Sequence, residues 1–202
     1  MIAVVRYDAG NVLSVVNALR RCGVEGFELT SDPETIKNAD KVILPGVGSF
    51  GDCMDNLQKY DLISVIKDFA ATDKPFLGIC LGLQLLFRGS DESEGVEGLN
   101  LLDGAIHRIP DAPSLKVPQI GWNSLELMNK GRLFKGIDNG AFVYFVHSYY
   151  LKADDPSIVT ATCDYNVTVH ASVEKGNIFG CQFHPEKSSD EGLKILKNFI
   201  DL

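Results

Sequence analysis

Residues 74–86 read Lys-Pro-Phe-Leu-Gly-Ile-Cys-Leu-Gly-Leu-Gln-Leu-Leu, and this stretch joins an apolar run directly to a helical pattern. The run at residues 75–80 predicts a buried strand, and the apolar spacing that follows predicts a helix over residues 81–87. A strand that passes straight into a helix at Gly-x-Cys-x-Gly is typical of a nucleophile elbow, with cysteine in place of serine. The flanking glycines leave room for the turn, and the helix N-terminus favours a thiolate. We therefore predict that Cys80 is a nucleophile, with a buried structural cysteine as the competing interpretation.

The pattern on both sides of this turn predicts the fold. Apolar runs predict further strands at residues 2–5, 27–29 and 41–44, and helical spacing predicts helices at 11–20, 54–59 and 62–71. Strands that are apolar on both faces and alternate with helices indicate a parallel sheet covered by helices. Later residues predict strands at 99–109, 116–127, 141–151, 159–163, 168–175 and 177–182, and a last helix at 190–199. We expect one α/β domain over residues 1–202, with a central, mostly parallel sheet and a β-rich second half.

Composition excludes several classes of protein. The 202 residues carry a net charge of -8, which argues against a general nucleic-acid binder. The five cysteines form no CxxC pair, so we expect neither a disulfide framework nor a metal site, and reduced thiols fit a cytoplasmic protein. The first residues lack the apolar core of a signal peptide, and no apolar stretch is long enough to span a membrane. The expectation is a cytoplasmic domain without a membrane segment.

A base for the cysteine is predicted at Phe-His-Pro-Glu, residues 183–186. A cysteine nucleophile needs a histidine, and the histidine needs a carboxylate that fixes its tautomer. His184 and Glu186 supply both from one short segment, and no Pro-Cys-x-x-Cys follows that would indicate a zinc deaminase. His147 is the rival base. We prefer His184 because no carboxylate lies two residues after His147.

The glycine-rich segment at residues 44–51, Leu-Pro-Gly-Val-Gly-Ser-Phe-Gly, contains a literal G-x-G-x-x-G. In a dinucleotide-binding domain this motif usually follows the first strand, and an acidic residue ends the next one. Here the next strand runs into Cys80 instead. We interpret the segment as a loop whose backbone N–H groups complete an oxyanion hole together with the N–H of Leu81.

With these motifs assembled, the chain resembles the class I glutamine amidotransferases, whose fold is flavodoxin-like, over nearly its whole length. Among them it is similar to the glutaminase subunits of imidazole glycerol phosphate synthase. The resemblance rests on Asp-x-Gly-Asn (8–11), Pro-Gly-Val-Gly-Ser-Phe (45–50), Gly-Ile-Cys-Leu-Gly-Leu-Gln-Leu-Leu (78–86), Ile-Gly-Trp-Asn (120–123), Tyr-Phe-Val-His-Ser-Tyr (144–149) and Glu-Lys-Gly-Asn-Ile-Phe-Gly-x-Gln-Phe-His-Pro-Glu-Lys-Ser (174–188).

The resemblance implies a role for each matching residue. The triad would be Cys80, His184 and Glu186. The glutamine substrate would be bound by Leu81, Gln84, Glu92, Ser148 and Tyr149, and by the oxyanion strand at Gly46, Val47 and Gly48, whose peptide turns over before the hole is competent. The partner interface would include Asn11, Trp122 and Lys187.

The resemblance also implies a partner, a cyclase subunit with a (β/α)₈ barrel that forms a heterodimer with this chain and receives its ammonia; no cofactor is implied. Two residues depart from the pattern. Gln119 stands where a histidine is expected, and Arg6 stands where the first strand is usually apolar or acidic. We expect both to affect the interface rather than the chemistry. Three alternatives remain open, namely a glutaminase that serves another synthase, a nicotinamide-dependent oxidoreductase, and a subunit that binds a partner without catalysis.

Overall fold

The computed structural model describes residues 1–9, 11–113, 115–129 and 131–202. Its strands are β1 (Ile2–Val5), β2 (Phe27–Thr30), β3 (Lys41–Gly46), β4 (Phe76–Cys80), β5 (Gly104–Arg108), β6 (Gln119–Ser124), β7 (Glu126–Leu127), β8 (Phe142–His147), β9 (Tyr149–Ala153), β10 (Val159–Asp164), β11 (Thr168–Lys175) and β12 (Ile178–Cys181). Its helices are α1 (Val12–Arg21), α2 (Pro33–Asn38), α3 (Phe50–Lys59), α4 (Leu62–Ala70), α5 (Leu81–Gln84) and α6 (Ser189–Ile200), with 3₁₀ helices η1 (Arg132–Phe134), η2 (Pro156–Ile158) and η3 (Pro185–Lys187). Within the described residues, no helix has the length and apolar character needed to cross a membrane.

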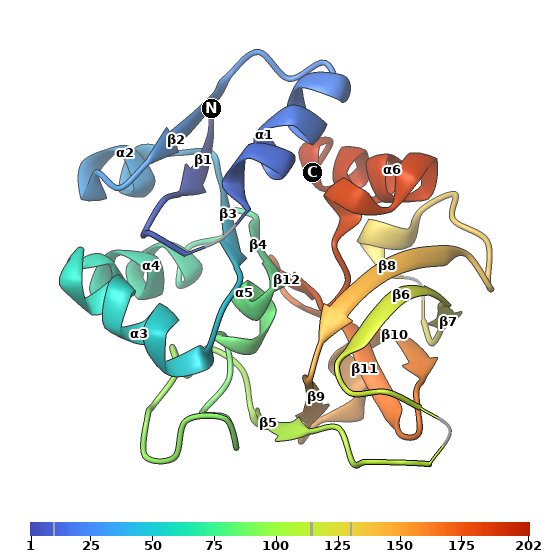
Figure 1. The fold of residues 1–202 in the computed structure, drawn as a ribbon. Coiled ribbons are helices and arrows are strands. Elements are labelled where there is room, and N and C mark those ends of the chain that lie inside the picture. The colour runs from blue at the N-terminus through green and yellow to red at the C-terminus, as the bar shows by residue number, and fades with distance from the viewer. Residues whose placement is uncertain (10, 114, 130) are drawn as a thin grey trace.

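One eight-stranded sheet forms the centre of the molecule, in the order β2-β1-β3-β4-β12-β11-β10-β7 (Figure 1). The strands from β2 to β12 pair in parallel, and those from β12 to β7 pair antiparallel. The predicted α/β sheet is thereby confirmed, and its antiparallel part comes from the β-rich second half of the chain. The consequence for the site is that β3, β4 and β12 are neighbours and end at the same edge.

Helices cover both faces of the parallel part, as expected for strands that are apolar on both sides. In β1, Ala3 and Val5 belong to the same buried cluster as residues of α2, α3 and α4. Ile2 and Val4 belong to a second cluster, together with residues of α1 and α6. The alternation along β1 is the period of two that a strand imposes on its side chains.

The sequence patterns missed α2, although its start carries clear signals. Asp32 accepts a hydrogen bond from the N–H of Thr35 at 2.9 Å, and Pro33 occupies the first helical position. An aspartate cap followed by proline is a common way to begin a helix. The helix is only six residues long, with Ile36 as its one buried residue, so its apolar periodicity is too short to detect.

The helix predicted at residues 81–87 is shorter, because α5 ends at Gln84. The following backbone bonds to a distant segment instead. The carbonyl of Leu85 accepts from Leu99 N–H, and that of Leu86 accepts from Leu101 N–H, each at 2.8 Å. The same pairing corrects the strand predicted at 99–109, of which only β5 forms. Tertiary hydrogen bonds thus override the local helical pattern.

The strand predicted at 141–151 is two strands that separate at Ser148. Its first half, β8, pairs with β6, and its second half, β9, pairs with β5 in another small sheet. The segment predicted at 116–127 divides in the same way, into β6 and β7. An apolar run does not show where the chain leaves one neighbouring strand and joins another. Each of the two predictions therefore gave one long strand where the structure has two.

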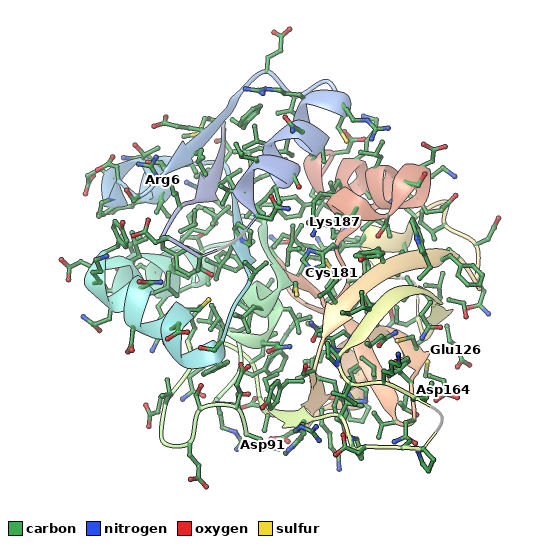
Figure 2. All side chains as sticks on the ribbon, viewed as in Figure 1. Arg6, Asp91, Glu126, Asp164, Cys181 and Lys187 are labelled. Atoms are coloured by element: carbon green, nitrogen blue, oxygen red, sulfur yellow. The ribbon has the colours of Figure 1, made fainter. Side chains whose placement is uncertain are left out.

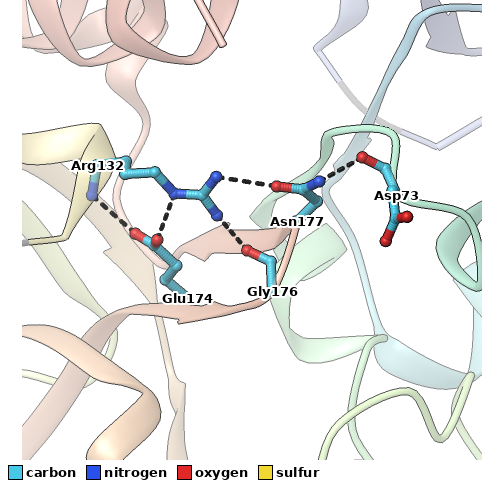
Figure 3. A network of polar contacts seen from close by, with 5 residues as sticks. All are labelled: Asp73, Arg132, Glu174, Gly176 and Asn177. Atoms are coloured by element: carbon cyan, nitrogen blue, oxygen red, sulfur yellow. Dashed lines mark hydrogen bonds and ion pairs between the residues drawn. The ribbon is translucent and has the colours of Figure 1, made fainter.

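A polar network anchors η1 to the main sheet (Figure 3). The guanidinium of Arg132 donates to Glu174 at 2.6 Å, to Asn177 at 2.9 Å and to the carbonyl of Gly176. Asn177 in turn donates to the carbonyl of Asp73, just before β4. The β11–β12 turn at residues 175–177 is therefore held from both sides.

Candidate active site

The backbone at Cys80 has the strained geometry of a nucleophile elbow. Its φ of 55° and ψ of -112° are backbone angles that residues other than glycine rarely adopt. A Cβ on Gly82 would lie 1.9 Å from the carbonyl oxygen of Leu44, and one on Gly78 would lie 2.6 Å from the carbonyl oxygen of Gly82. Neither position can hold a larger residue without backbone movement. The flanking glycines therefore allow β4 to turn into α5 with the cysteine at its tip.

His184 and Glu186 follow β12, the parallel neighbour of β4, so the topology brings them to the cysteine. The Nδ1 atom of His184 lies 2.8 Å from Glu186 Oε1, and the two side chains are only 4% and 2% exposed. Burial alone would lower the pKa of His184, but hydrogen bonds to Cys80 and Glu186 outweigh it and raise the pKa to about 10. His184 therefore carries a proton at neutral pH, with Nδ1 on the carboxylate and Nε2 left for the sulfur.

The second carboxylate oxygen of Glu186, Oε2, is buried and has no hydrogen-bond partner among the described residues. A cavity of about 10 Å³, lined by Glu186, Asn11 and Gly46, lies beside it. That volume has room for about one water molecule, which is the ordinary way to satisfy a buried carboxylate oxygen.

A cavity of about 290 Å³ opens onto the cysteine and is large enough for a small metabolite. Most of the predicted substrate residues line it, namely Val47, Gly48, Leu81, Gln84, Glu92, Ser148 and Tyr149, together with Cys80, His184 and Lys187. Pro118, Val146 and His147 also line it. A larger cavity of about 810 Å³ lies by η1 and the end of α6. The described residues that line this larger cavity include no cysteine or histidine, so the smaller one is the candidate for chemistry.

The glycine loop lies directly against the elbow. Gly46 stands opposite Cys80 in the β3–β4 register, and a Cβ there would come within 2.7 Å of the N–H of Gly82. Leu81 is the first residue of α5, so its N–H has no acceptor within the helix. Val47, Gly48 and Leu81 line the same cavity as Cys80, so an oxyanion formed there would lie close to this backbone.

The first N–H groups of α3, which a dinucleotide phosphate would use, are already bonded within the chain. Phe50 N–H donates to Glu92 Oε2 at 2.8 Å, and Gly51 N–H donates to Ser93 Oγ at 2.9 Å. This arrangement disfavours the oxidoreductase alternative. It also means that Glu92 joins the substrate cavity to the helix that follows the glycine loop.

His147, the rival base, is a buried neutral histidine in the cavity wall. Burial outweighs its hydrogen bond to Tyr149 and lowers the pKa of His147 to about 4. Its Nδ1–H donates to the carbonyl of Tyr149 at 2.8 Å, and Oε1 of Gln119 lies 2.9 Å from Nε2. A neutral ring has one N–H, which Tyr149 accepts here. Both ring nitrogens are occupied, and His147 has none free for Cys80.

Gln119 itself is buried, with 3% of its surface exposed. Its side chain contacts His147, which lines the substrate cavity, and the effect of its departure on the interface stays a prediction. Arg6 is exposed at the end of β1 and lies apart from Lys187 (Figure 2). The backbone N–H of Arg6 donates to the carbonyl of Thr30, on the neighbouring strand β2, at 2.8 Å.

Of the predicted interface residues, Lys187 lines the substrate cavity, Asn11 lines the small cavity beside Glu186, and Trp122 lies on β6. Trp122 is 52% exposed and packs edge-on against Tyr144, with ring centroids 6.0 Å apart. Asn11 is exposed before α1, and Lys187 borders the substrate cavity. Gly10, part of the N-terminal motif, lies outside the described residues.

Sequence reasoning assigned no role to Gln182. It follows β12, is fully buried, and its Nε2 lies 3.8 Å from the sulfur of Cys80. Its position two residues before the predicted base was the one signal that could have identified it.

Comparison with known proteins agrees with this geometry. A family model for class I glutamine amidotransferases matches residues 5–202. Among solved structures, PurLQS from Thermotoga maritima aligns with a TM-score of 0.75 at 22% identity, covering 99% of this chain and 97% of that one. A crystal structure of a glutamine amidotransferase aligns with a TM-score of 0.77 at 17% identity, covering 100% and 98%. At these identities the likeness shows the fold alone.

Two relatives are closer in sequence. The imidazole glycerol phosphate synthase subunit HisH of Moorella thermoacetica is 49% identical over 201 residues, covering 100% of this chain and 94% of that one. The HisH subunit of Syntrophotalea carbinolica is 44% identical over 207 residues, covering 100% of both. The chain therefore belongs to the class I glutamine amidotransferases, and within them to the HisH glutaminase subunits of imidazole glycerol phosphate synthase.

Proposed function

We propose that Cys80 is the nucleophile of the glutaminase reaction, with His184 as its acid and base and Glu186 as the group that orients His184. The observation that carries this assignment is the meeting of the three residues beside one small cavity. The elbow exposes the sulfur to that cavity, and the buried His184–Glu186 pair, 2.8 Å apart, lies next to it. We place these three residues in a single domain that spans residues 1–202.

The raised pKa of His184 sets the order of proton transfers. His184 holds the thiol proton before the reaction, and the thiolate of Cys80 attacks the side-chain amide carbon of glutamine. The tetrahedral oxyanion is met by the N–H of Leu81 and by the backbone near Val47. His184 then protonates the leaving nitrogen, and ammonia departs from a glutamyl thioester. Water gives a proton to His184 as it attacks the thioester, which releases glutamate and restores the starting pair.

The remaining cavity residues suit the other groups of glutamine. Glu92 has one oxygen bonded to Phe50 N–H, which leaves the other for the α-ammonium group of the substrate. Ser148 and Tyr149 line the same cavity and would hold the α-carboxylate. Gln84 uses its NH₂ group within the protein, so its carbonyl oxygen is left for the substrate.

The HisH family is named as one subunit of a synthase, and we propose that the partner is the cyclase (β/α)₈ barrel, bound as a heterodimer. An exposed apolar face supports docking beside the site. Ile120 and Trp122 lie two residues apart on the same side of β6, and Phe142 lies on the neighbouring β8. Their surfaces are 63%, 52% and 58% exposed, respectively. Asn11 and Lys187 would border this interface, and the ammonia would cross it. All five cysteines are free thiols, which suits a cytoplasmic complex.

The test combines Cys80→Ala with the cyclase subunit and its ribotide substrate. We expect glutamine-dependent turnover to fall by more than about 10³-fold, while turnover with added ammonium salt stays within twofold. Cys22→Ser serves as the matched control, because Cys22 donates only to the carbonyl of Leu193 and should keep full glutaminase activity. Loss of both activities in a folded Cys80→Ala complex would refute the assignment.

A further inference from the structure

Gln182 contacts the nucleophile from inside the protein. Its side chain is completely buried, and its Nε2 donates to Cys80 Sγ at 3.8 Å. Its backbone is also fixed, since its N–H donates to the carbonyl of Ala171 at 2.8 Å. Because the side chain is buried and the backbone is fixed, the carboxamide keeps one orientation and holds one of its atoms against the sulfur.

The direction of this carboxamide is set by a chain of donors and acceptors. The carbonyl of Tyr149 can only accept, and Gln84 Nε2 lies 3.0 Å from it, so the NH₂ group of Gln84 must face Tyr149. The same NH₂ group lies 2.9 Å from the carboxamide of Gln182, which must therefore present its oxygen there. The NH₂ group of Gln182 is then the part that faces Cys80.

The sulfur has a second contact of the opposite kind. The thiol can donate to the carbonyl of Val146, 3.7 Å away, only while it keeps its proton. The N–H of Gln182 favours the deprotonated sulfur, because hydrogen bonds to charged acceptors are stronger than those to neutral ones. The two contacts thus favour different protonation states of Cys80.

We propose that Gln182 is a positioning residue for the reaction, whose amide N–H, oriented by Gln84, holds the sulfur of Cys80 and stabilises its thiolate before glutamine binds. This rests on the proposed role of Cys80 as nucleophile. It also connects recognition with reactivity, because Gln84 lines the substrate cavity and fixes Gln182 at the same time.

The experiment measures alkylation of Cys80 by iodoacetamide from pH 5 to 10, followed by mass spectrometry of the peptide that contains it. Gln182→Met removes the donor, and Gln182→Glu keeps the oxygen for Gln84 but places a negative charge at the sulfur. We expect the alkylation rate at pH 7 to fall about tenfold in Gln182→Met and further in Gln182→Glu, with the midpoint of the pH profile moved to higher pH. The kcat for glutamine should fall in parallel, with KM within about twofold.

Ser172→Ala is the matched control, because Ser172 is equally buried on β11 and donates to the carbonyl of Gly180, not to the sulfur. It should keep the wild-type profile. A wild-type profile in Gln182→Glu overturns the proposal. If wild-type Cys80 reacts no faster than the half-buried Cys22, the nucleophile assignment itself fails, which is a different outcome.

Should both variants fail to fold, NMR of the wild-type side-chain amide decides the question. The Nε2 proton signals of Gln182 should shift when Cys80 is alkylated and should titrate with the same midpoint as the alkylation profile. Signals that do not respond to either change overturn the proposal.

Discussion

Acidification should destabilise this protein through His147, and the structure gives the size of the effect. His147 is buried, its Nδ1–H donates to the carbonyl of Tyr149, and its Nε2 lies 2.9 Å from Oε1 of Gln119. Its pKa is lowered from 6.5 to about 4, so the folded state binds fewer protons than the unfolded state between these values. Stability from this group is therefore complete above pH 6.5 and is lost as the pH falls toward 4.

The magnitude follows from linkage. A shift from 6.5 to about 4 is worth about 3 kcal/mol when the pH lies below both values, and about 2 kcal/mol of that is already lost at pH 5. Other groups titrate in the same window, so the quantity to measure is a difference between variants. His184 in particular adds about 1 kcal/mol to the stability of the folded state as the pH falls from 7 to 5, because its pKa is raised.

The assay is urea unfolding at pH 7 and pH 5 for the wild type and for His147→Asn. We expect the wild type to lose about 2 kcal/mol more than the variant between the two pH values. Gln119→Glu offers a converse test, since a negative charge beside Nε2 should keep His147 protonated, which removes the slope. Equal slopes in the wild type and His147→Asn, or NMR signals of a protonated ring at pH 7, would refute the reasoning.

Three further predictions concern the elbow, the surface network and the interface. Gly82→Ala should cost more than about 3 kcal/mol in thermal unfolding, because its Cβ would lie 1.9 Å from the carbonyl of Leu44; a cost below about 1 kcal/mol would contradict the elbow geometry. Arg132→Ala should cost about 1 kcal/mol in urea unfolding at low salt and less at 1 M salt, because Arg132 is half exposed although it pairs with Glu174; no salt dependence would argue against the ion pair. Trp122→Ala should leave the free subunit as stable as before within about 0.5 kcal/mol, yet weaken cyclase binding more than about tenfold by calorimetry; unchanged affinity would place the interface elsewhere.

The sequence was most informative where local chemistry and topology coincide. Gly-x-Cys-x-Gly requires a strand, a tight turn and a helix in that order, so its geometry follows from thirteen residues at 74–86. His184 and Glu186 were identifiable for a similar reason, because a base and its carboxylate lie two residues apart. The parallel sheet followed from runs that are apolar on both faces, and β1 matches its predicted bounds of 2–5.

The same patterns could not show where distant backbone segments pair. Leucines at 81–86 have helical spacing, but α5 ends at Gln84 because the carbonyls of Leu85 and Leu86 bond to residues 99 and 101. Likewise, nothing in the apolar run at 141–151 marks Ser148 as the point where one strand leaves β6 and the next joins β5. These are tertiary hydrogen bonds, and periodicity in the sequence does not encode them.

The polar interior of the site was the least predictable part, because one backbone carbonyl orders it. Tyr149 accepts from Gln84 on one side and from His147 on the other, at 3.0 and 2.8 Å. Since a carbonyl cannot donate, it fixes the direction of Gln84 and, through it, of Gln182. Gln119 joins the same network from the other side, with its Oε1 2.9 Å from Nε2 of His147. Gln119 is therefore one end of a chain of polar contacts that passes through Tyr149 and ends at the sulfur of Cys80.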